Sequence, residues 1–154
     1  MNTDPNVPRR DFLVSGAVLA AATLSATPNS ATAQPAGGRV TAHVLDLYTG
    51  VPAEGIRIDL LAIDGTASRV LKSVTTNVEG RPPEGPLVLP EGMKTGRYQA
   101  VVHVGDYYKK IGAKVPSGYF TKLILEFDIY DAKTPHHLPF QITPWTQSAS
   151  VLPG

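Results

Sequence analysis

The sequence of 154 residues contains no cysteine, and charged residues make up only 18% of it. The absence of cysteine excludes disulfide bonds, thiolate nucleophiles and thiolate metal sites. The formal net charge is only +1, so no concentrated basic face is available, and neither nucleic acid nor an acidic membrane surface is expected as the main partner. The length suits one domain and is too short for two of ordinary size.

The first 33 residues differ in composition from the rest. The paired arginines Arg9 and Arg10 stand before Phe-Leu, and a mildly apolar run over residues 13–24 leads through small residues to an Ala-x-Ala pattern that ends at Ala33. This order is typical of a bacterial twin-arginine export signal. A membrane anchor is the alternative, but the run is shorter than the roughly 20 apolar residues that span a bilayer. We therefore expect residues 1–33 to be a signal peptide cleaved near Ala33, the twin-arginine export machinery to be a partner, and the mature protein to be periplasmic.

Alternation of apolar and polar residues dominates the rest of the chain, after a Gln-Pro-Ala-Gly-Gly linker over residues 34–38. Half-buried strands are expected over residues 40–45, 56–62, 70–76, 98–104 and 123–129. Only residues 106–111 are predicted to be helical, as a turn or two ended by Gly112. Short strands between Gly/Pro turns predict an all-β, antiparallel β-sandwich with one short helix, formed as a single domain by residues 39–154.

The last predicted strand, Leu138–Thr143, contains Pro139 and is followed by Pro144. Because proline cannot donate a hydrogen bond to a neighbouring strand, this segment is expected at the edge of a sheet. An apolar edge in a small sandwich invites pairing with another chain, and a second subunit would cover it. An oligomer is therefore expected.

Polar residues gather in four places where solubility alone is a weak explanation. They are His43 in the first strand, the Thr-Asn-Val-Glu-Gly-Arg turn that ends at Arg81, the Gly-Asp-Tyr-Tyr corner of residues 105–108, and the His-His-Leu-Pro sequence of residues 136–139. Together and in this order, these motifs resemble the family that contains transthyretin and 5-hydroxyisourate hydrolase. The resemblance extends over about residues 39–148.

This resemblance implies a transthyretin-like (prealbumin-like) sandwich and an active site that needs no cofactor and no metal. In the hydrolase branch, a first-strand histidine, an arginine after the turn and a histidine near the last strand line the active site. His43, Arg81 and His137 hold those positions here. They are replaced in the hormone-carrying branch, so their presence favours the hydrolase. The resemblance also implies a homotetramer, built as a dimer of dimers, with sites in a channel where the dimers meet.

The implied substrate is 5-hydroxyisourate, an intermediate of urate degradation in purine catabolism, or a close cyclic ureide. Its ring opens when water adds to a ring carbonyl and a C–N bond breaks. Histidine has an unperturbed pKa near neutrality and can take a proton from water. Arginine can donate hydrogen bonds to the oxygen that gains negative charge, and its own charge favours neutral histidines. Which histidine activates water and which protonates the departing nitrogen stays open.

The C-terminus departs from the hydrolase pattern. Hydrolases of the family typically end in Tyr-Arg-Gly-Ser, whereas residues 148–154 read Ser-Ala-Ser-Val-Leu-Pro-Gly. Residues 135–137 read Pro-His-His where the family usually has His-Tyr-His. These changes remove a positive donor, and Val151 and Leu152 would make the site more apolar. A transthyretin-like protein that binds a small ligand without turnover is therefore the alternative to the hydrolase, and a structural domain without pocket chemistry is a third possibility.

Other candidate residues are given structural roles. His136 points to the opposite face from His137 if the strand is regular, and His103 is expected to be structural. Tyr107, Tyr108 and Trp145 are expected in packing or subunit contacts. A zinc site from His43, His137 and a carboxylate is conceivable, but no closely spaced second pair of ligands supports it.

Overall fold

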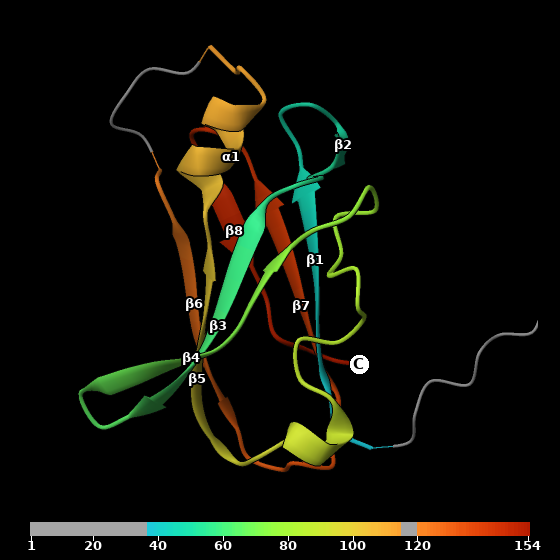
Figure 1. Ribbon diagram of the computed structural model, residues 1–154, viewed down its shortest axis with the longest axis vertical. Coiled ribbons are helices and arrows are strands. Elements are labelled where there is room, and N and C mark those ends of the chain that lie inside the picture. The colour runs from blue at the N-terminus through green and yellow to red at the C-terminus, as the bar shows by residue number, and fades with distance from the viewer. Residues whose placement is uncertain (1–36, 115–119) are drawn as a thin grey trace, which may run out of the picture. The chain divides into compact units, whose positions relative to one another are not determined.

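The computed structural model describes residues 37–114 and 120–154 (Figure 1). The expected signal peptide, residues 1–33, lies outside the described residues. In chain order the elements are β1 (Val40–Asp46), β2 (Val51–Pro52), β3 (Arg57–Asp64), β4 (Ala67–Thr75), the 3-10 helix η1 (Pro90–Gly92), β5 (Gly96–Val102), α1 (Val104–Lys110), β6 (Leu123–Ile129), β7 (His136–Ile142), β8 (Gln147–Ala149) and β9 (Leu152–Pro153). No helix in the described part is both long enough and apolar enough to cross a membrane.

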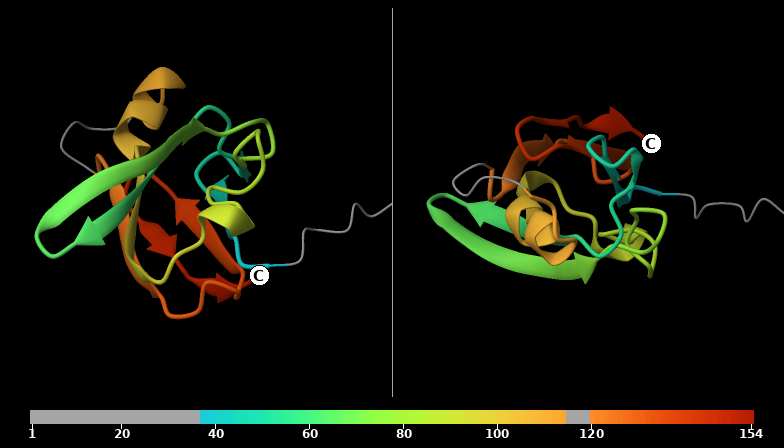
Figure 2. Two further views of the ribbon diagram at one scale, coloured as in Figure 1. Left: turned by 60° about the horizontal axis from the view of Figure 1, so that its bottom comes forward. Right: turned by 90° about the horizontal axis from the view of Figure 1, so that it is seen from above.

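The strands form two sheets that face each other as two layers (Figure 2, right). One sheet has the order β2-β1-β7-β8, with β9 also paired to β7, and the other has the order β4-β3-β5-β6. Every pairing between these strands is antiparallel except that of β1 with β7, which is parallel. The predicted all-β sandwich with one short helix is confirmed.

The core lies between the inner faces of the two sheets. Along β1, buried residues alternate with half-buried ones, so that Val40, Ala42 and Val44 face inward while Thr41, His43 and Leu45 face outward. The inward side chains of β1 belong to one cluster with fully buried residues of β3, β5 and β7, among them Ile58, Leu60, Ala100, Leu138, Phe140 and Ile142. Burying a side chain of this size stabilises the fold by about 1.5–3 kcal/mol. The outward face of β1 is therefore free for chemistry.

A buried carboxylate fixes the end of β1 to the helix. Asp46 is 1% exposed and accepts hydrogen bonds from the hydroxyls of Tyr108 (2.6 Å), Tyr107 (3.1 Å) and Thr49 (2.7 Å). The backbone N–H of Tyr48 donates to the same carboxylate at 2.9 Å. The two helix tyrosines are thus packing residues, as predicted, and they hold α1 against the turn after β1.

The prediction that Leu138–Thr143 forms an edge strand is wrong. The observed strand β7 lies between β1 and the C-terminal segment that forms β8 and β9. Proline is tolerated at position 139 because its backbone nitrogen points to the C-terminal segment and not to β1. In the register of that segment, Pro139 lies opposite Ser150, which is in the gap between β8 and β9. The N–H of Ser150 still donates to the Pro139 carbonyl at 3.3 Å. Proline therefore removes one hydrogen bond at a place where the ladder is already interrupted.

Several boundaries differ from the prediction by one to three residues, among them those where β5 meets α1. Strand β5 ends at Val102 and helix α1 begins at Val104, whereas the sequence predicted a strand to residue 104 and a helix from residue 106. The short strands β2, β8 and β9 were not predicted.

Candidate active site

The outward face of β1 and β7 carries two of the three predicted site residues. In the parallel register, Thr41 lies opposite His137 and His43 lies opposite Pro139. Partners in register share a face of the sheet, so His43 and His137 both face outward, on neighbouring strands and two positions apart. The strands β1 and β7 run side by side in Figure 1.

Arg81 reaches this face through a turn that is closed by Asn77. The side-chain oxygen of Asn77 accepts hydrogen bonds from the N–H groups of Glu79 and Arg81, both at 3.0 Å. Gly80 has φ of +69°, and a Cβ there would collide with the Val44 carbonyl, so this position requires glycine. The Gly80 carbonyl accepts from the Val44 N–H at 2.9 Å. Arg81 therefore leaves the turn directly beside β1, next to His43.

Burial and positive charge keep both histidines neutral. Partial burial lowers the pKa of His43, and the charge of Arg81 lowers it further, while the backbone and charge of Glu79 act in the opposite direction. Burial, then Arg81, then His43 lower the pKa of His137. Because Arg81 acts on both rings, the three residues form one electrostatic group. At neutral pH the imidazoles are in the form that can accept a proton.

Thr41 fixes the orientation of His137. Its hydroxyl oxygen lies 2.9 Å from Nδ1 of His137 and 3.3 Å from the backbone carbonyl oxygen of His136. When the hydroxyl donates to the carbonyl and accepts from a protonated Nδ1, both contacts are satisfied, and in that tautomer Nε2 of His137 is unprotonated. The sequence analysis missed Thr41, although its position two residues before His43 places it on the same face.

A small cavity adjoins these residues. It has a volume of about 220 Å³ and lies between β1 and the segment of residues 81–86, and it is lined by Arg39, Thr41, Ala42, Arg81, Pro82, Gly85 and Pro86. We call it the Arg39–Arg81 cavity. Arg81 and Thr41 are among its lining residues and His43 and His137 are not, so the cavity lies next to the histidines. Arg39, which the sequence analysis did not single out, lies two residues before Thr41 and directly before β1.

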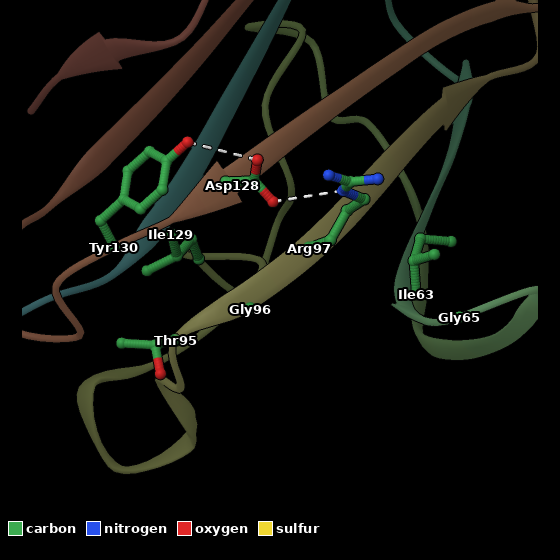
Figure 3. Close-up of a pocket in the computed structure, with 8 residues that line it drawn as sticks. All are labelled: Ile63, Gly65, Thr95, Gly96, Arg97, Asp128, Ile129 and Tyr130. Carbon is green, nitrogen blue, oxygen red and sulfur yellow. Dashed lines mark hydrogen bonds and ion pairs between the residues drawn. The ribbon is translucent and has the colours of Figure 1, made fainter.

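A larger hollow of about 480 Å³ lies on the other sheet, beside the ends of β5 and β6 (Figure 3). Arg97 there is paired with Asp128 at 3.3 Å and with Glu126 at 3.6 Å. The hydroxyl of the exposed Tyr130 donates to the same Asp128 at 3.4 Å. No histidine lines this hollow in the described part of the chain. It is larger, but it lacks a group that could act as a base near neutrality, so we place the chemistry at the histidines.

The remaining histidines are held away from this site. His103 is 7% exposed, and its Nε2 lies 2.7 Å from the carboxylate of Asp59, which also binds Arg57 and Ser73. His136 lies opposite Val40 in the register and faces the other side of the sheet from His137, as predicted. Within residues 37–114 and 120–154, no three His, Asp or Glu side chains are grouped so as to hold a metal ion.

The C-terminal segment lies beside His137. Strands β8 and β9 pair with β7 in one continuous register, in which Gln141 is opposite Ser148 and His137 is opposite Leu152. Leu152 thus shares the outward face with His137, and it is 46% exposed. An apolar side chain therefore borders the site.

Comparison with known proteins gives a consistent result. The model of the HIUase/Transthyretin family matches residues 40–149. The chain is 42% identical to the 5-hydroxyisourate hydrolase 2 of Rhizobium meliloti (strain 1021) over 112 residues, which are 72% of this chain and 92% of the relative. Among solved structures, (S)-allantoin synthase is similar to this chain with a TM-score of 0.70 and 29% identity. The match covers 76% of this chain but only 44% of the longer synthase. The 5-hydroxyisourate hydrolase of Klebsiella pneumoniae has a TM-score of 0.61 at 30% identity and covers 75% of this chain and 99% of its own.

Proposed function

The chain belongs to the HIUase/transthyretin family, and we propose that it is a hydrolase that opens the ring of 5-hydroxyisourate or a close cyclic ureide, with His43, Arg81 and His137 as its reacting groups. One observation carries the assignment of the residues. Two imidazoles with lowered pKa values share one outward face with the arginine whose charge acts on both of them. The two 5-hydroxyisourate hydrolases named above support the reaction.

In the mechanism that we propose, His137 is the base. Thr41 holds the proton of His137 on Nδ1, so Nε2 can take a proton from water. The water oxygen then bonds to the ring carbonyl carbon, and Arg81 donates hydrogen bonds to the carbonyl oxygen as it becomes negative. When the C–N bond breaks, the proton that His137 took from water passes through His43 to the departing nitrogen, and both imidazoles are neutral again. The new carboxylic acid ionises, and the site returns to its starting state.

The decisive experiment follows the decay of 5-hydroxyisourate made freshly from urate. Because the compound also decays unaided, both the rate above buffer and the optical activity of the product are measured. We expect a faster decay and one enantiomer, with the rate strongly reduced in His43→Ala, Arg81→Ala and His137→Ala. His136→Ala is the matched control, since that ring faces away from the site, and it should keep the activity.

The same measurement separates the alternative functions. A decay no faster than in buffer, with racemic product, would refute the hydrolase. Tight binding of a small ligand on the histidine face without turnover would then select the transthyretin-like carrier. Neither activity nor binding would leave a structural domain.

We further propose a homotetramer, a dimer of dimers. Large apolar side chains are exposed just after the C-terminal ends of β1 and β7, namely Leu47, Tyr48, Val51 and Trp145. Tyr48 and Trp145 contact each other edge to face at 5.5 Å between ring centroids. Exposed apolar groups of this kind favour contact with another subunit. Light scattering coupled to size exclusion should give four times the subunit mass, and a monomer would contradict the proposal.

Export through the twin-arginine route is the last part of the proposal. It is supported by the order of Arg9, Arg10, the mildly apolar run and Ala33. The family match begins at residue 40, after the expected cleavage position. Fractionation of cells that express the full chain should place a product lacking about residues 1–33 in the periplasm. Replacing both arginines by lysine should retain the uncleaved chain in the cytoplasm, and cleavage that is unaffected would contradict the route.

A further inference from the structure

His137 has apolar neighbours on three sides of the outward face of its sheet. Pro135 and Pro139 stand two residues before it and two residues after it, and residues two apart in a strand point to the same face. Pro135 continues the pairing of β7, because its carbonyl accepts from the Gly154 N–H at 3.0 Å. On the neighbouring strand, Leu152 lies directly opposite His137. These neighbours agree with burial as the largest cause of the lowered pKa of His137.

The fourth side of His137 is polar. Thr41 lies opposite it on β1, His43 follows two residues later on the same face, and Arg81 leaves its turn beside that strand. The Arg39–Arg81 cavity lies on this side too. His137 thus stands between two unlike halves of the site. We call Thr41, His43 and Arg81 the polar half, and the three neighbours on β7 and β9, Pro135, Pro139 and Leu152, the apolar half.

Backbone pairing fixes Leu152 in the apolar half. The C-terminal segment keeps one register against β7 through β8 and β9. Between these two strands, the Ser150 N–H donates to the Pro139 carbonyl at 3.3 Å. Leu152 is nonetheless 46% exposed, so its side chain is not spent on the core. A large apolar side chain that is exposed beside reacting groups favours contact with an apolar part of a ligand or with another chain.

A ureide without substituents matches only the polar half. The edge of its ring carries N–H and C=O groups, and such a group loses its hydrogen bonds to water when it lies against proline and leucine. An alkyl group at that edge has no hydrogen bond to lose, and it gains apolar contact. In the proposed mechanism Arg81 holds the reacting carbonyl on the polar half, so the opposite edge of the ring lies over the apolar half.

We propose that the site takes cyclic ureides that carry an alkyl substituent, and that Leu152 is the specificity residue that contacts this substituent. The inference rests on the proposed function for the reacting ring, and it adds the substituent that the apolar half selects. Unsubstituted 5-hydroxyisourate is then a substrate that binds less tightly.

Stable ligands test this preference without any turnover. Urate and its N-monomethyl derivatives share one planar ureide ring system and differ by a single methyl group. In calorimetric titration of the full protein, at least one methyl isomer should bind about fourfold more tightly than urate, which corresponds to about 0.8 kcal/mol for one buried methyl group. Leu152→Asn keeps a similar size and should abolish the preference, whereas Leu152→Met should keep it. Leu71→Asn makes the same change in an exposed leucine of β4, on the other sheet, and should leave the preference intact.

Three results of the titration would overturn the inference. They are equal or weaker binding of every methyl isomer, binding of none of these ligands, and a preference that survives in Leu152→Asn. Light scattering on the same variant completes the test. A change in its oligomeric mass without a change in the preference would show that Leu152 contacts another subunit and not the ligand.

Kinetics separate the inference from the proposed function. Methylated 5-hydroxyisourates are made by electrochemical oxidation of the methylurates, and their decay is followed as for the parent compound. In Leu152→Asn, kcat/KM should fall for the preferred methylated compound and not for the parent, whereas a folding defect would lower both. If a methylurate binds through Leu152 but no compound decays faster than in buffer, the proposed function fails and the preference stands. If 5-hydroxyisourate is hydrolysed and the methyl group improves neither affinity nor kcat/KM, the function stands and the inference fails.

Discussion

Replacing Thr41 by valine should slow the reaction by releasing His137 from its tautomer. Valine keeps the branched shape of threonine and removes only the hydroxyl that lies 2.9 Å from Nδ1 of His137. Without that acceptor, the proton on Nδ1 loses its partner, and the ring populates the form with the proton on Nε2. That form cannot take a proton from water at Nε2.

The size of the effect follows from one hydrogen bond. A hydrogen bond between uncharged groups contributes about 1 kcal/mol net, and Thr41 and His137 are both half-buried. This changes a tautomer ratio about fivefold at 25 °C. We therefore expect kcat to fall by up to about fivefold in Thr41→Val, with a loss of stability of no more than about 1 kcal/mol. Thr41→Ser keeps a hydroxyl in the same place and should retain most of the rate.

Two measurements check this reasoning. Initial rates of 5-hydroxyisourate decay give kcat and KM for the three proteins. Nitrogen-15 NMR of the histidine rings, recorded above their titration range, reports directly which nitrogen of His137 carries the proton. If Nε2 of His137 carries the proton in the unmodified protein, the proposed tautomer is wrong. Equal losses of kcat in Thr41→Val and Thr41→Ser would also contradict the reasoning, because serine keeps the hydroxyl and valine does not.

Three further predictions concern charged groups. Arg81→Gln should move the acid limb of the pH–rate profile to higher pH, because the charge that lowers the pKa of both site histidines is removed; a limb that stays in place would contradict this. The maximal rate should also fall by about 10²–10³, as for other lost oxyanion donors. Asp46→Asn should destabilise the fold by about 1.5–3 kcal/mol in urea unfolding, since the tyrosine hydroxyls lose a buried carboxylate acceptor, and no measurable change would show that the corner adapts. The hydrogen bonds from Arg57 hold the pKa of Asp59 well below its usual range, so this carboxylate stabilises the fold fully above about pH 4 and progressively less as the pH falls toward its lowered pKa. Asp59→Asn should be less stable at neutral pH and should lose less stability between about pH 4 and pH 2 than the unmodified protein does, with urea unfolding at each pH as the measurement.

The strands were predictable where one face is buried and the other is not. Residues 40–45 and 123–129 alternate in the sequence because their inward side chains fill the core, and both segments are strands in the structure. The strands β8 and β9 could not be predicted in this way. They have three and two residues, and their Ser, Ala and Pro side chains do not alternate in polarity. Their pairing with β7 is fixed by the backbone ladder, which leaves no periodic signal.

The site was predictable only in part, because two of its features depend on long-range pairing. His43, Arg81 and His137 were identified from motifs, and the structure brings them to one face. Thr41 was missed because a threonine in a strand is ordinary, and its contact with His137 joins residues 96 positions apart. Arg39 was missed because only the fold shows that it lines the same cavity as Arg81, which is 42 positions away in the sequence.

The position of His137 is determined by the core more than by the site. A slip of one residue between β1 and β7 would turn His137 inward and His136 outward, since side chains alternate along a strand. The same slip would expose Leu138, Phe140 and Ile142, which are each 0% exposed. At about 1.5–3 kcal/mol for each side chain, this costs about 5–9 kcal/mol, which is comparable to the whole stability of a small domain. The two neighbouring histidines are therefore not interchangeable: the apolar side chains that follow them decide which one meets Thr41 and faces the substrate.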